Sequence, residues 1–332
     1  MTRVATFGTG SWGTVVASLM REVGAEVTMW GRRAEAVEQI NRSVNEDYLP
    51  GIELPEGMRA TTDPHQAAAG ADIVVLAVPS QTLRENLKQW GDAIPTGAAV
   101  VSLMKGIELG TGLRMSQVIH EAAGVETERI AVLSGPNLAR EVMAHQPAAT
   151  MVACPDHGTA EQVAAAVAAP YFRPYTSTDI IGAEIAGSVK NVIALAVGMA
   201  EGMGMGDNSK ASIITRGLAE MTRLGVAVGG DRVTFSGLAG VGDLIATCMS
   251  PLSRNHTFGV NLGKGMSVDE VVAITKQTAE GVKSCASIVQ LAHDNDVQVP
   301  IAEQMLEVIQ NGLHPSVVVD RLLSRPRKTE TA

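Results

Sequence analysis

The stretch Val4-Ala5-Thr6-Phe7-Gly8-Thr9-Gly10-Ser11-Trp12-Gly13 joins a short apolar run to three spaced glycines and the start of a helical pattern. In a strand–turn–helix of this kind, the first glycine allows a tight turn and the second lets a pyrophosphate approach the backbone. The third lets the helix pack on the strand. Unpaired N–H groups at the helix N-terminus also attract phosphate. The stretch therefore predicts a dinucleotide site formed by Gly8, Gly10, Ser11, Trp12 and Gly13.

Short apolar runs alternate with helical patterns through the first half of the chain. The runs are rich in Val, Ile and Ala, as in strands that helices cover on both faces. This alternation predicts an α/β domain with a doubly wound, mostly parallel, Rossmann-like sheet over residues 1–177. The expected strands are Val4–Phe7, Glu26–Trp30, Asp72–Val78, Ala98–Met104, Ile130–Ser134, Ala149–Ala153 and a segment near Arg173–Thr176, and the expected helices include Trp12–Val23, Ala34–Asn41 and Gln81–Trp90.

From about Ser177 onward the apolar residues follow a helical period, and no further strand is expected. The capping box Ser267-Val268-Asp269-Glu270 marks one helix start, and Pro300 suits the first turn of another. We therefore expect an all-α domain over residues 178–324 and a polar tail over residues 325–332. The expected helices are Ile180–Glu201, Ser209–Val228, Leu238–Met249, Val268–Lys276, Gly281–Ala292, Ile301–Gln310 and Ser316–Leu323.

Composition and charge argue against several classes of protein. The 332 residues suffice for two domains, and a hydrophobic content of 45% is ordinary for a globular protein. A net charge of −9 argues against nonspecific nucleic-acid binding. Neither a signal peptide nor an apolar segment of bilayer length is evident, so we expect a cytoplasmic protein without membrane insertion. The three separated cysteines fit reduced thiols, and no His/Cys spacing predicts a metal site.

The second expected strand ends at Trp30 and is followed by Gly31, Arg32 and Arg33. An Asp or Glu at this place would bind the adenosine ribose hydroxyl of NAD, whereas arginines suit the additional phosphate of NADP. A solvated pair of arginines at a helix start is the simpler alternative. The pattern favours NADPH as the cofactor, with NADH as the second candidate.

Lys190 is the single charged residue between Glu184 and Glu201, in a run that is typical of a buried helix. Burying an ammonium group is costly unless another group compensates the charge. Burial also favours the neutral amine, so such a lysine can exchange the proton that accompanies hydride transfer. A lysine that snorkels to water is the alternative. Asp243, after the Gly240-Val241-Gly242 turn, is the candidate carboxylate that holds Lys190, or else an ordinary first-turn acid.

Other polar residues follow expected strands or open expected helices. Lys105 follows the Ala98–Met104 strand and Ser134-Gly135-Pro136-Asn137-Leu138-Ala139 ends another, at the sheet edge where α/β proteins bind ligands. Ser253-Arg254-Asn255 combines a guanidinium with hydroxyl and amide groups, which suits a phosphate. Glu280 could accept hydrogen bonds from a cofactor. Lys105 has the alternative of a solvated loop lysine, and the Ser253-Arg254-Asn255 cluster has that of a surface loop.

Taken together, these residues resemble the bacterial NAD(P)-dependent glycerol-3-phosphate dehydrogenase family. The resemblance implies a Rossmann-like domain joined to a 6-phosphogluconate-dehydrogenase-like helical domain. It also implies reduction of dihydroxyacetone phosphate to sn-glycerol 3-phosphate with NAD(P)H, which supplies the phospholipid backbone. The matching motifs, in family order, are Gly8-Thr9-Gly10-Ser11-Trp12-Gly13, Leu103-Met104-Lys105-Gly106, Ser134-Gly135-Pro136, Lys190-Asn191, Gly240-Val241-Gly242-Asp243-Leu244 and Ser253-Arg254-Asn255.

The resemblance assigns roles residue by residue, with Lys190 as the catalytic acid/base. The positions that correspond to substrate contacts are Lys105, Gly135, Asn137, Lys190, Asn191, Asp243, Thr247, Ser253, Arg254 and Asn255. The positions that correspond to cofactor contacts are Gly8, Gly10, Ser11, Trp12, Gly13, Arg32, Arg33, Lys105, Ala139, Arg254, Thr278 and Glu280. The chain departs from the family pattern at Asn137-Leu138, where Ser or Thr and then Phe are usual, and at Thr278, where an aliphatic residue is usual.

Two other functions stay open at the level of sequence. A β-hydroxyacid dehydrogenase also joins a Rossmann domain to helices, but those enzymes resemble G-x-x-x-K-x-x-x-N. Here Gly187 lies three residues before Lys190, and Asn191 directly follows it. A redox-sensing module that binds NADPH without turnover would not need a lysine in an apolar helix together with an arginine cluster. We expect a small phosphorylated substrate, no nucleic-acid partner, and a homodimer formed through apolar helix faces.

Overall fold

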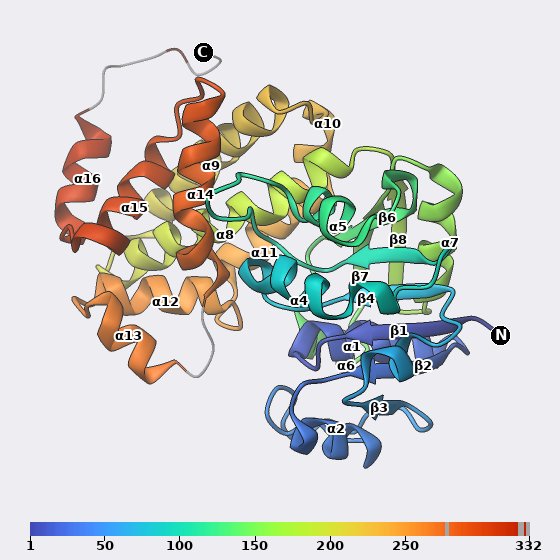
Figure 1. The fold of residues 1–332 in the computed structure, drawn as a ribbon. Coiled ribbons are helices and arrows are strands. Elements are labelled where there is room, and N and C mark those ends of the chain that lie inside the picture. The colour runs from blue at the N-terminus through green and yellow to red at the C-terminus, as the bar shows by residue number, and fades with distance from the viewer. Residues whose placement is uncertain (276–278, 325–328, 330–332) are drawn as a thin grey trace.

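The computed structural model describes residues 1–275, 279–324 and 329. An eight-stranded sheet lies in the N-terminal half, and helices alone make up the described chain beyond it (Figure 1). The strands are β1 (Arg3–Phe7), β2 (Glu26–Trp30), β3 (Arg59–Thr61), β4 (Ile73–Leu76), β5 (Ala99–Ser102), β6 (Ile130–Ser134), β7 (Ala148–Ala153) and β8 (Phe172–Ser177). Their order is β3-β2-β1-β4-β5-β6-β7-β8, and each neighbouring pair is parallel except β6–β7. The predicted mostly parallel, doubly wound sheet is confirmed.

The strands differ from the expected ones in two respects. β4 and β5 are shorter than the segments Asp72–Val78 and Ala98–Met104, because the chain leaves the sheet before those apolar runs end. β3 is not predicted by the sequence, since its three residues lie at the sheet edge and none of them is buried. Both differences concern strand ends and edges, where periodicity carries the least information.

Helices cover both faces of the sheet, as the alternating pattern predicts. One face is buried by α1 (Ser11–Glu22), α6 (Ala139–Met143) and α7 (His157–Val167). The other is buried by α3 (Pro64–Ala68), α4 (Leu83–Trp90) and α5 (Met115–Ala123). α2 (Ala34–Asn41) follows β2, and a short 3-10 turn, η1 (Ser80–Thr82), precedes α4. The expected helices α1, α2 and α4 therefore begin and end within about two residues of their predicted bounds.

The helical half is built around α8 (Ile180–Gly202), the predicted apolar helix that carries Lys190. The other helices are α9 (Asp207–Ala227), α10 (Arg232–Phe235), α11 (Asp243–Met249), α12 (Arg254–Gly263), α13 (Val268–Ile274), α14 (Glu280–Asp294), α15 (Pro300–Asn311) and α16 (Pro315–Leu323). By length and hydropathy α8 could cross a membrane, although Glu184 and Lys190 interrupt it, so it is not the uncharged apolar segment whose absence the sequence analysis expects. However, 94% of its apolar window is buried inside the protein, as in a core helix.

α12 is a helix that the sequence analysis did not predict, because its two glycines lower its helix propensity. These are Gly259 and Gly263, which lie against Gly198 and Gly202 of α8. A Cβ added at any of the four would overlap backbone atoms of the facing helix. The two backbones are therefore in direct contact, and the glycines are a packing feature rather than a break in the helix.

The single helix expected over Leu238–Met249 is wrong in its first part. Gly240 has non-helical backbone angles (φ −89°, ψ −106°), so a π-helical turn, η4 (Leu238–Gly242), precedes α11. This break makes Asp243 the first residue of α11. The capping box that opens α13 and the proline that opens α15 are confirmed. Lys276 and most of the expected tail lie outside the described residues, and the domain boundary after residue 177 stays a prediction.

Candidate active site

Two lysines from different halves of the chain contact one buried carboxylate. Lys190 of α8 donates hydrogen bonds to Asp243 Oδ1 and to Thr247 Oγ1, the latter at 2.6 Å. Lys105, which follows β5, donates to Asp243 Oδ2 at 2.6 Å. Lys190 and Asp243 are only 5% and 2% exposed. Because Lys105 leaves the carboxyl end of β5, these contacts place Lys190 at the sheet edge where the glycine-rich turn also lies.

The surroundings of this cluster shift its protonation. Burial lowers the pKa of Lys190 to about 7, Asp243 opposes that shift, and Lys105 adds to it. Burial alone would raise the pKa of Asp243, but the two lysines outweigh it and hold that pKa below its usual value. Near neutral pH the cluster therefore contains a carboxylate beside an amine that can gain or lose a proton.

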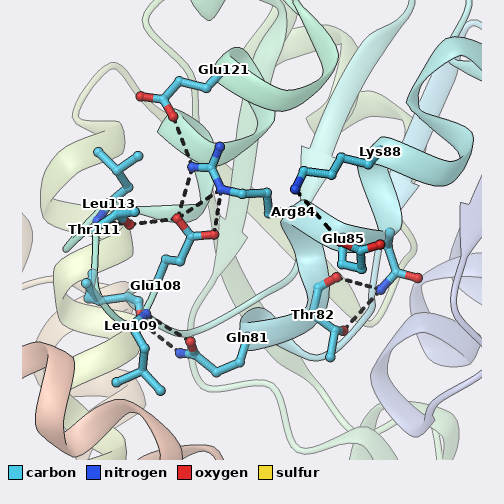
Figure 2. A network of polar contacts seen from close by, with 12 residues as sticks. Gln81, Thr82, Arg84, Glu85, Lys88, Glu108, Leu109, Thr111, Leu113 and Glu121 are labelled. Carbon is cyan, nitrogen blue, oxygen red and sulfur yellow. Dashed lines mark hydrogen bonds and ion pairs between the residues drawn. The ribbon is translucent and has the colours of Figure 1, made fainter.

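The loop that follows Lys105 is fixed by side chains of η1 and α4 (Figure 2). Gln81 donates to one backbone carbonyl of this loop at 2.8 Å and accepts from a backbone N–H at 3.0 Å. Arg84 forms ion pairs with Glu108 of the loop and with Glu121 of α5, each at 2.9 Å. These residues carry no motif, so sequence reasoning did not single them out. They restrict the backbone from which the Lys105 side chain extends.

Gly135 and Asn137 lie in the turn between β6 and α6. Gly135 has a φ of +153°, and a Cβ there would lie 3.1 Å from the Cα of Thr150. Asn137 Nδ2 donates to Thr150 Oγ1 at 2.8 Å, whereas Asn137 Oδ1 is buried without a hydrogen-bond partner among the described residues. The hydroxyl of Ser134 is also buried without a hydrogen-bond partner among the described residues. Unpartnered buried oxygens are costly, so this turn fits a polar ligand or a water molecule.

A chain of amide groups links α8, α12 and α14. Asn255 Nδ2 donates to Asn191 Oδ1 at 3.0 Å, and Asn255 Oδ1 accepts from Gly281 N at 2.9 Å. Ser253 is the N-cap of α12, and its hydroxyl accepts a backbone N–H. Arg254 is the exposed first residue of that helix. The Ser253-Arg254-Asn255 cluster is therefore a helix N-terminus and not a surface loop.

The glycine-rich turn leaves room for a phosphate beside the start of α1. Gly8 has a φ of +119°, and a Cβ there would lie 2.5 Å from Ala77 O. A Cβ at Gly13 would lie 2.7 Å from the Cβ of Ala77, so close packing requires both glycines. Gly10 differs, because no atom lies within 4 Å of a Cβ at its position and no side chain caps α1 there. Open space beside uncapped N–H groups fits the pyrophosphate of a dinucleotide.

Arg32 and Arg33 follow β2, and Arg33 is the N-cap of α2. Arg33 Nη2 lies 2.7 Å from Asp47 Oδ2, and the Arg33 guanidinium lies 6.0 Å from the centre of the Tyr48 ring. The hydrogen bond to Asp47 raises the pKa of Arg33. Asp47 and Tyr48 lie in a loop without periodicity or motif, so the sequence alone offers no signal for them.

The remaining predicted cofactor positions are separated in the fold. Three of them open helices, namely Ser11 and Trp12 in α1 and Ala139 in α6. Glu280, the first residue of α14, accepts a hydrogen bond from Ser80 Oγ at 2.8 Å and so reaches the sheet half of the molecule. Thr278 lies outside the described residues. Within the described ranges, no group of three His, Cys, Asp or Glu side chains could hold a metal ion.

Two family models match the two halves of the chain. The NAD-dependent glycerol-3-phosphate dehydrogenase N-terminus matches residues 3–160, and the NAD-dependent glycerol-3-phosphate dehydrogenase C-terminus matches residues 179–320. The first match lies in the part that contains the sheet, and the second begins with the residue that caps α8.

Full-length relatives agree with these matches. Glycerol-3-phosphate dehydrogenase (NAD(P)+) from Streptomyces coelicolor is 59% identical over 329 residues, which cover 99% of this chain and 98% of that protein. The protein of the same name from Thermobifida fusca is 58% identical over 332 residues, covering 99% of each. The crystal structure of glycerol-3-phosphate dehydrogenase from Coxiella burnetii is 33% identical, with a TM-score of 0.93, and covers 98% of this chain and 99% of its own.

Proposed function

We propose, since this chain belongs to the NAD-dependent glycerol-3-phosphate dehydrogenase family, that it reversibly reduces dihydroxyacetone phosphate to sn-glycerol 3-phosphate. NADPH is the proposed electron donor and NADH the second candidate, and the product would supply glycerophospholipid synthesis. The observation that carries the proposal is the buried contact of Lys190 with Asp243 at the carboxyl edge of the sheet, the edge where β1 leads into the glycine-rich turn with open space beside Gly10.

Lys190 is the proposed general acid and base. Bound NADPH would supply a hydride to the carbonyl carbon of the substrate, and the carbonyl oxygen must then receive a proton. The Lys190 ammonium can polarise that oxygen and donate the proton, because its pKa is lowered to about 7. In the oxidative direction the neutral amine accepts the hydroxyl proton. Asp243 and Thr247 orient the amine through their hydrogen bonds.

The start of α12 is the proposed phosphate site. Arg254 offers a guanidinium fork there, and the N-terminus of this ten-residue helix adds partial positive charge. Ser253 and Asn255 flank Arg254 with hydroxyl and amide groups, and Asn255 is positioned by Asn191. Lys105 is the proposed second cation.

The turn after β6 is the proposed contact for the substrate hydroxyl. Asn137 Oδ1, which lacks a partner among the described residues, can accept a hydrogen bond from the hydroxyl group of dihydroxyacetone phosphate. Gly135 lets the turn pass close to Thr150. Asn137 replaces the Ser or Thr that is usual in the family and still offers both a donor and an acceptor.

The proposed cofactor residues divide between the two ends of the dinucleotide. Arg32 and Arg33 would bind the additional phosphate of NADP. The proposed contacts nearer the pyrophosphate and nicotinamide are Gly8, Gly10, Ser11, Trp12, Gly13, Lys105, Ala139, Arg254, Thr278 and Glu280. These positions come from the sheet edge, from α12 and from the start of α14, so the cofactor would bind between the two halves.

The domain boundary, the oligomer and the location are further parts of the proposal. We place the boundary between residues 177 and 178, where the last strand of the sheet ends. A cytoplasmic location is part of the proposal, and a homodimer is supported by the exposed apolar side chains Ile245, Met249 and Leu252 on and after α11. Sedimentation of the purified protein would test the dimer directly.

A spectrophotometric assay with both the substrate and the cofactor tests the activity. The protein is mixed with NADPH and dihydroxyacetone phosphate, and the absorbance of the reduced nicotinamide is followed. We expect oxidation with this ketone and none with carboxylic semialdehydes. Oxidation with the semialdehydes alone would select a β-hydroxyacid dehydrogenase, and NADPH binding without any oxidation would select a sensing module.

A further inference from the structure

The loop after α2 brings a carboxylate to the arginines that follow β2. Asn45 lies in this loop, is 1% exposed, and donates hydrogen bonds to Thr9 O at 3.0 Å and to Thr14 Oγ1 at 2.9 Å. Thr9 lies within the glycine-rich turn, so the loop is tied to the phosphate site. The backbone N–H groups of Tyr48 and Leu49 bond to Asn45 O. Asp47 therefore lies in a turn whose position is fixed relative to the cofactor site.

Within this turn, Asp47 forms an ion pair with one of the two arginines, Arg33. Its Oδ2 lies 2.7 Å from Arg33 Nη2, and the two side chains are 41% and 52% exposed. The Tyr48 ring lies on the same guanidinium at 6.0 Å. Within the described part of the chain, no ion pair or hydrogen bond joins the side chain of Arg32 to another residue. The two neighbouring arginines therefore differ: Arg33 is already engaged by an anion, and Arg32 is available.

We propose that Asp47 is a specificity-determining residue that limits the preference for a 2′-phosphorylated dinucleotide over an unphosphorylated one. The proposal rests on the proposed function, in which the adenosine end of the cofactor lies beside Arg32 and Arg33. Asp47 reduces selectivity by binding the guanidinium that the 2′-phosphate would otherwise use alone.

The physical reason is competition between two anions for one cation. A guanidinium binds phosphate best when its fork is free to donate parallel N–H bonds, and the Asp47 carboxylate occupies one of those donors. A phosphate that shares Arg33 with Asp47 is also repelled by that carboxylate. An unphosphorylated ribose carries no charge at this position and loses nothing. The effect is therefore confined to the 2′-phosphate and is screened by salt, since both groups are half exposed.

The test measures the binding of cofactor fragments that contain only the adenosine end of the dinucleotide. The full-length protein and its Asp47→Asn variant are titrated calorimetrically with 2′,5′-ADP and with 5′-AMP. We expect the dissociation constant of 2′,5′-ADP to fall by about fivefold in the variant, the upper range for an exposed pair, and that of 5′-AMP to stay unchanged. The gain should shrink as ionic strength rises. Steady-state kinetics should show the same shift in the ratio of the NADPH and NADH Michaelis constants.

Glu46→Gln is the matched control, because it removes the same charge one residue away while the Arg33 pair remains. Its fragment affinities should equal those of the wild type, and an equal gain in this control would reduce the effect to net charge and overturn the proposal. Unchanged or equally changed affinities for both fragments in Asp47→Asn would also overturn it. In those cases a wild type that still oxidises NADPH with dihydroxyacetone phosphate leaves the proposed function intact. A wild type that binds neither fragment and oxidises no NADPH would remove the proposed function itself.

Discussion

Lys190, Asp243 and Lys105 form a cluster in which one buried carboxylate serves two ammonium groups. With both lysines protonated, the cluster carries a single net positive charge. The protein as a whole has a net charge of −9, so attraction for an anionic substrate must come from local groups of this kind. The same arrangement keeps Asp243 paired even when Lys190 loses its proton, which lowers the cost of that proton transfer.

Replacement of Lys190 by alanine should lower kcat by a factor on the order of 10² to 10⁴, the usual contribution of general acid catalysis. The dissociation constant of NADPH, measured by fluorescence titration, should change little because Asp243 keeps Lys105 as a partner. Lys88→Ala, which removes an exposed lysine of α4, is the control and should leave both values unaltered. Near-normal turnover in Lys190→Ala would contradict its role as proton donor.

The pH dependence of kcat/KM should follow the amine of Lys190. Reduction uses the protonated amine, and its pKa is lowered to about 7, so kcat/KM for dihydroxyacetone phosphate should fall above about pH 7. Oxidation of glycerol 3-phosphate uses the neutral amine and should rise over the same range. Asp243→Asn removes the charge that opposes the shift, so both inflections should move to lower pH. Inflections that stay in place would belong to the substrate phosphate and not to Lys190.

At the scale of elements, α8 and α12 act as one unit because their backbones touch at Gly198, Gly202, Gly259 and Gly263. α8 carries the proposed acid, and α12 begins with the proposed phosphate ligand. Asn191 and Asn255 add a hydrogen bond between the same two helices. A change at the glycines should therefore affect the geometry of the site as well as the stability of the fold.

Gly259→Ala should destabilise the protein by about 1–3 kcal/mol, the usual cost of forcing extra volume into a packed core. Its Cβ would overlap the carbonyl oxygen of Leu195, which is backbone and cannot rotate away. Gly158→Ala is the matched control, because Gly158 is an exposed helical glycine of α7 whose added Cβ would meet no backbone atom and only the Asp156 carboxylate, at 3.2 Å. Urea denaturation of both variants gives the comparison. Equal stability in the two would show that the helices can separate to admit a methyl group.

Most elements could be predicted from the sequence because burial dictates their periodicity. β6 and α2 have their predicted bounds, and α8 ends one residue beyond its expected bound. β3 and α12 could not be predicted: β3 has three residues and no buried face, and the glycines of α12 gain their meaning only from the helix they contact. Local sequence does not record such partners.

The candidate site shows the same division. Lys190 stood out because it is charged in an apolar helix, and its contact with Asp243 was predicted from the glycine turn before that residue. Asp47, Ser80 and Gln81 did not stand out, because each acts through a contact with a residue that lies distant in sequence or in an irregular loop. Only the folded chain reveals those pairs.

For the whole molecule, the proposed site is formed from both halves. Asp243 belongs to the helical half and binds Lys105 of the sheet half. Glu184 of α8 accepts hydrogen bonds from Arg114 and from the backbone of Ser116, at 2.5 and 2.7 Å, and so joins α8 to α5. Figure 1 shows the helical half and the sheet half side by side, with α8 and α11 labelled between them. Loss of these contacts would separate the two lysines.

Arg254→Ala should raise the Michaelis constant for dihydroxyacetone phosphate on the order of tenfold to a hundredfold, because a phosphate would lose a charged hydrogen-bond partner. Arg254→Lys keeps the charge without the fork and should give an intermediate value. Arg59→Ala, at the exposed sheet edge, is the control. Steady-state kinetics at saturating NADPH measures all three, and an unchanged constant in Arg254→Ala would place the phosphate elsewhere.

The contact between α8 and α12 has a consequence for ligand choice. Because the backbones of α8 and α12 are in contact, the two helices cannot shift to fit a longer molecule. The distance from the Lys190 amine on α8 to the Arg254 guanidinium on α12 is therefore fixed. A ketone with an additional methylene between carbonyl and phosphate could contact either Lys190 or Arg254, but not both together. The four glycines at this contact, which have a hydrogen atom where other residues have a side chain, would thus set the length of molecule that the enzyme accepts.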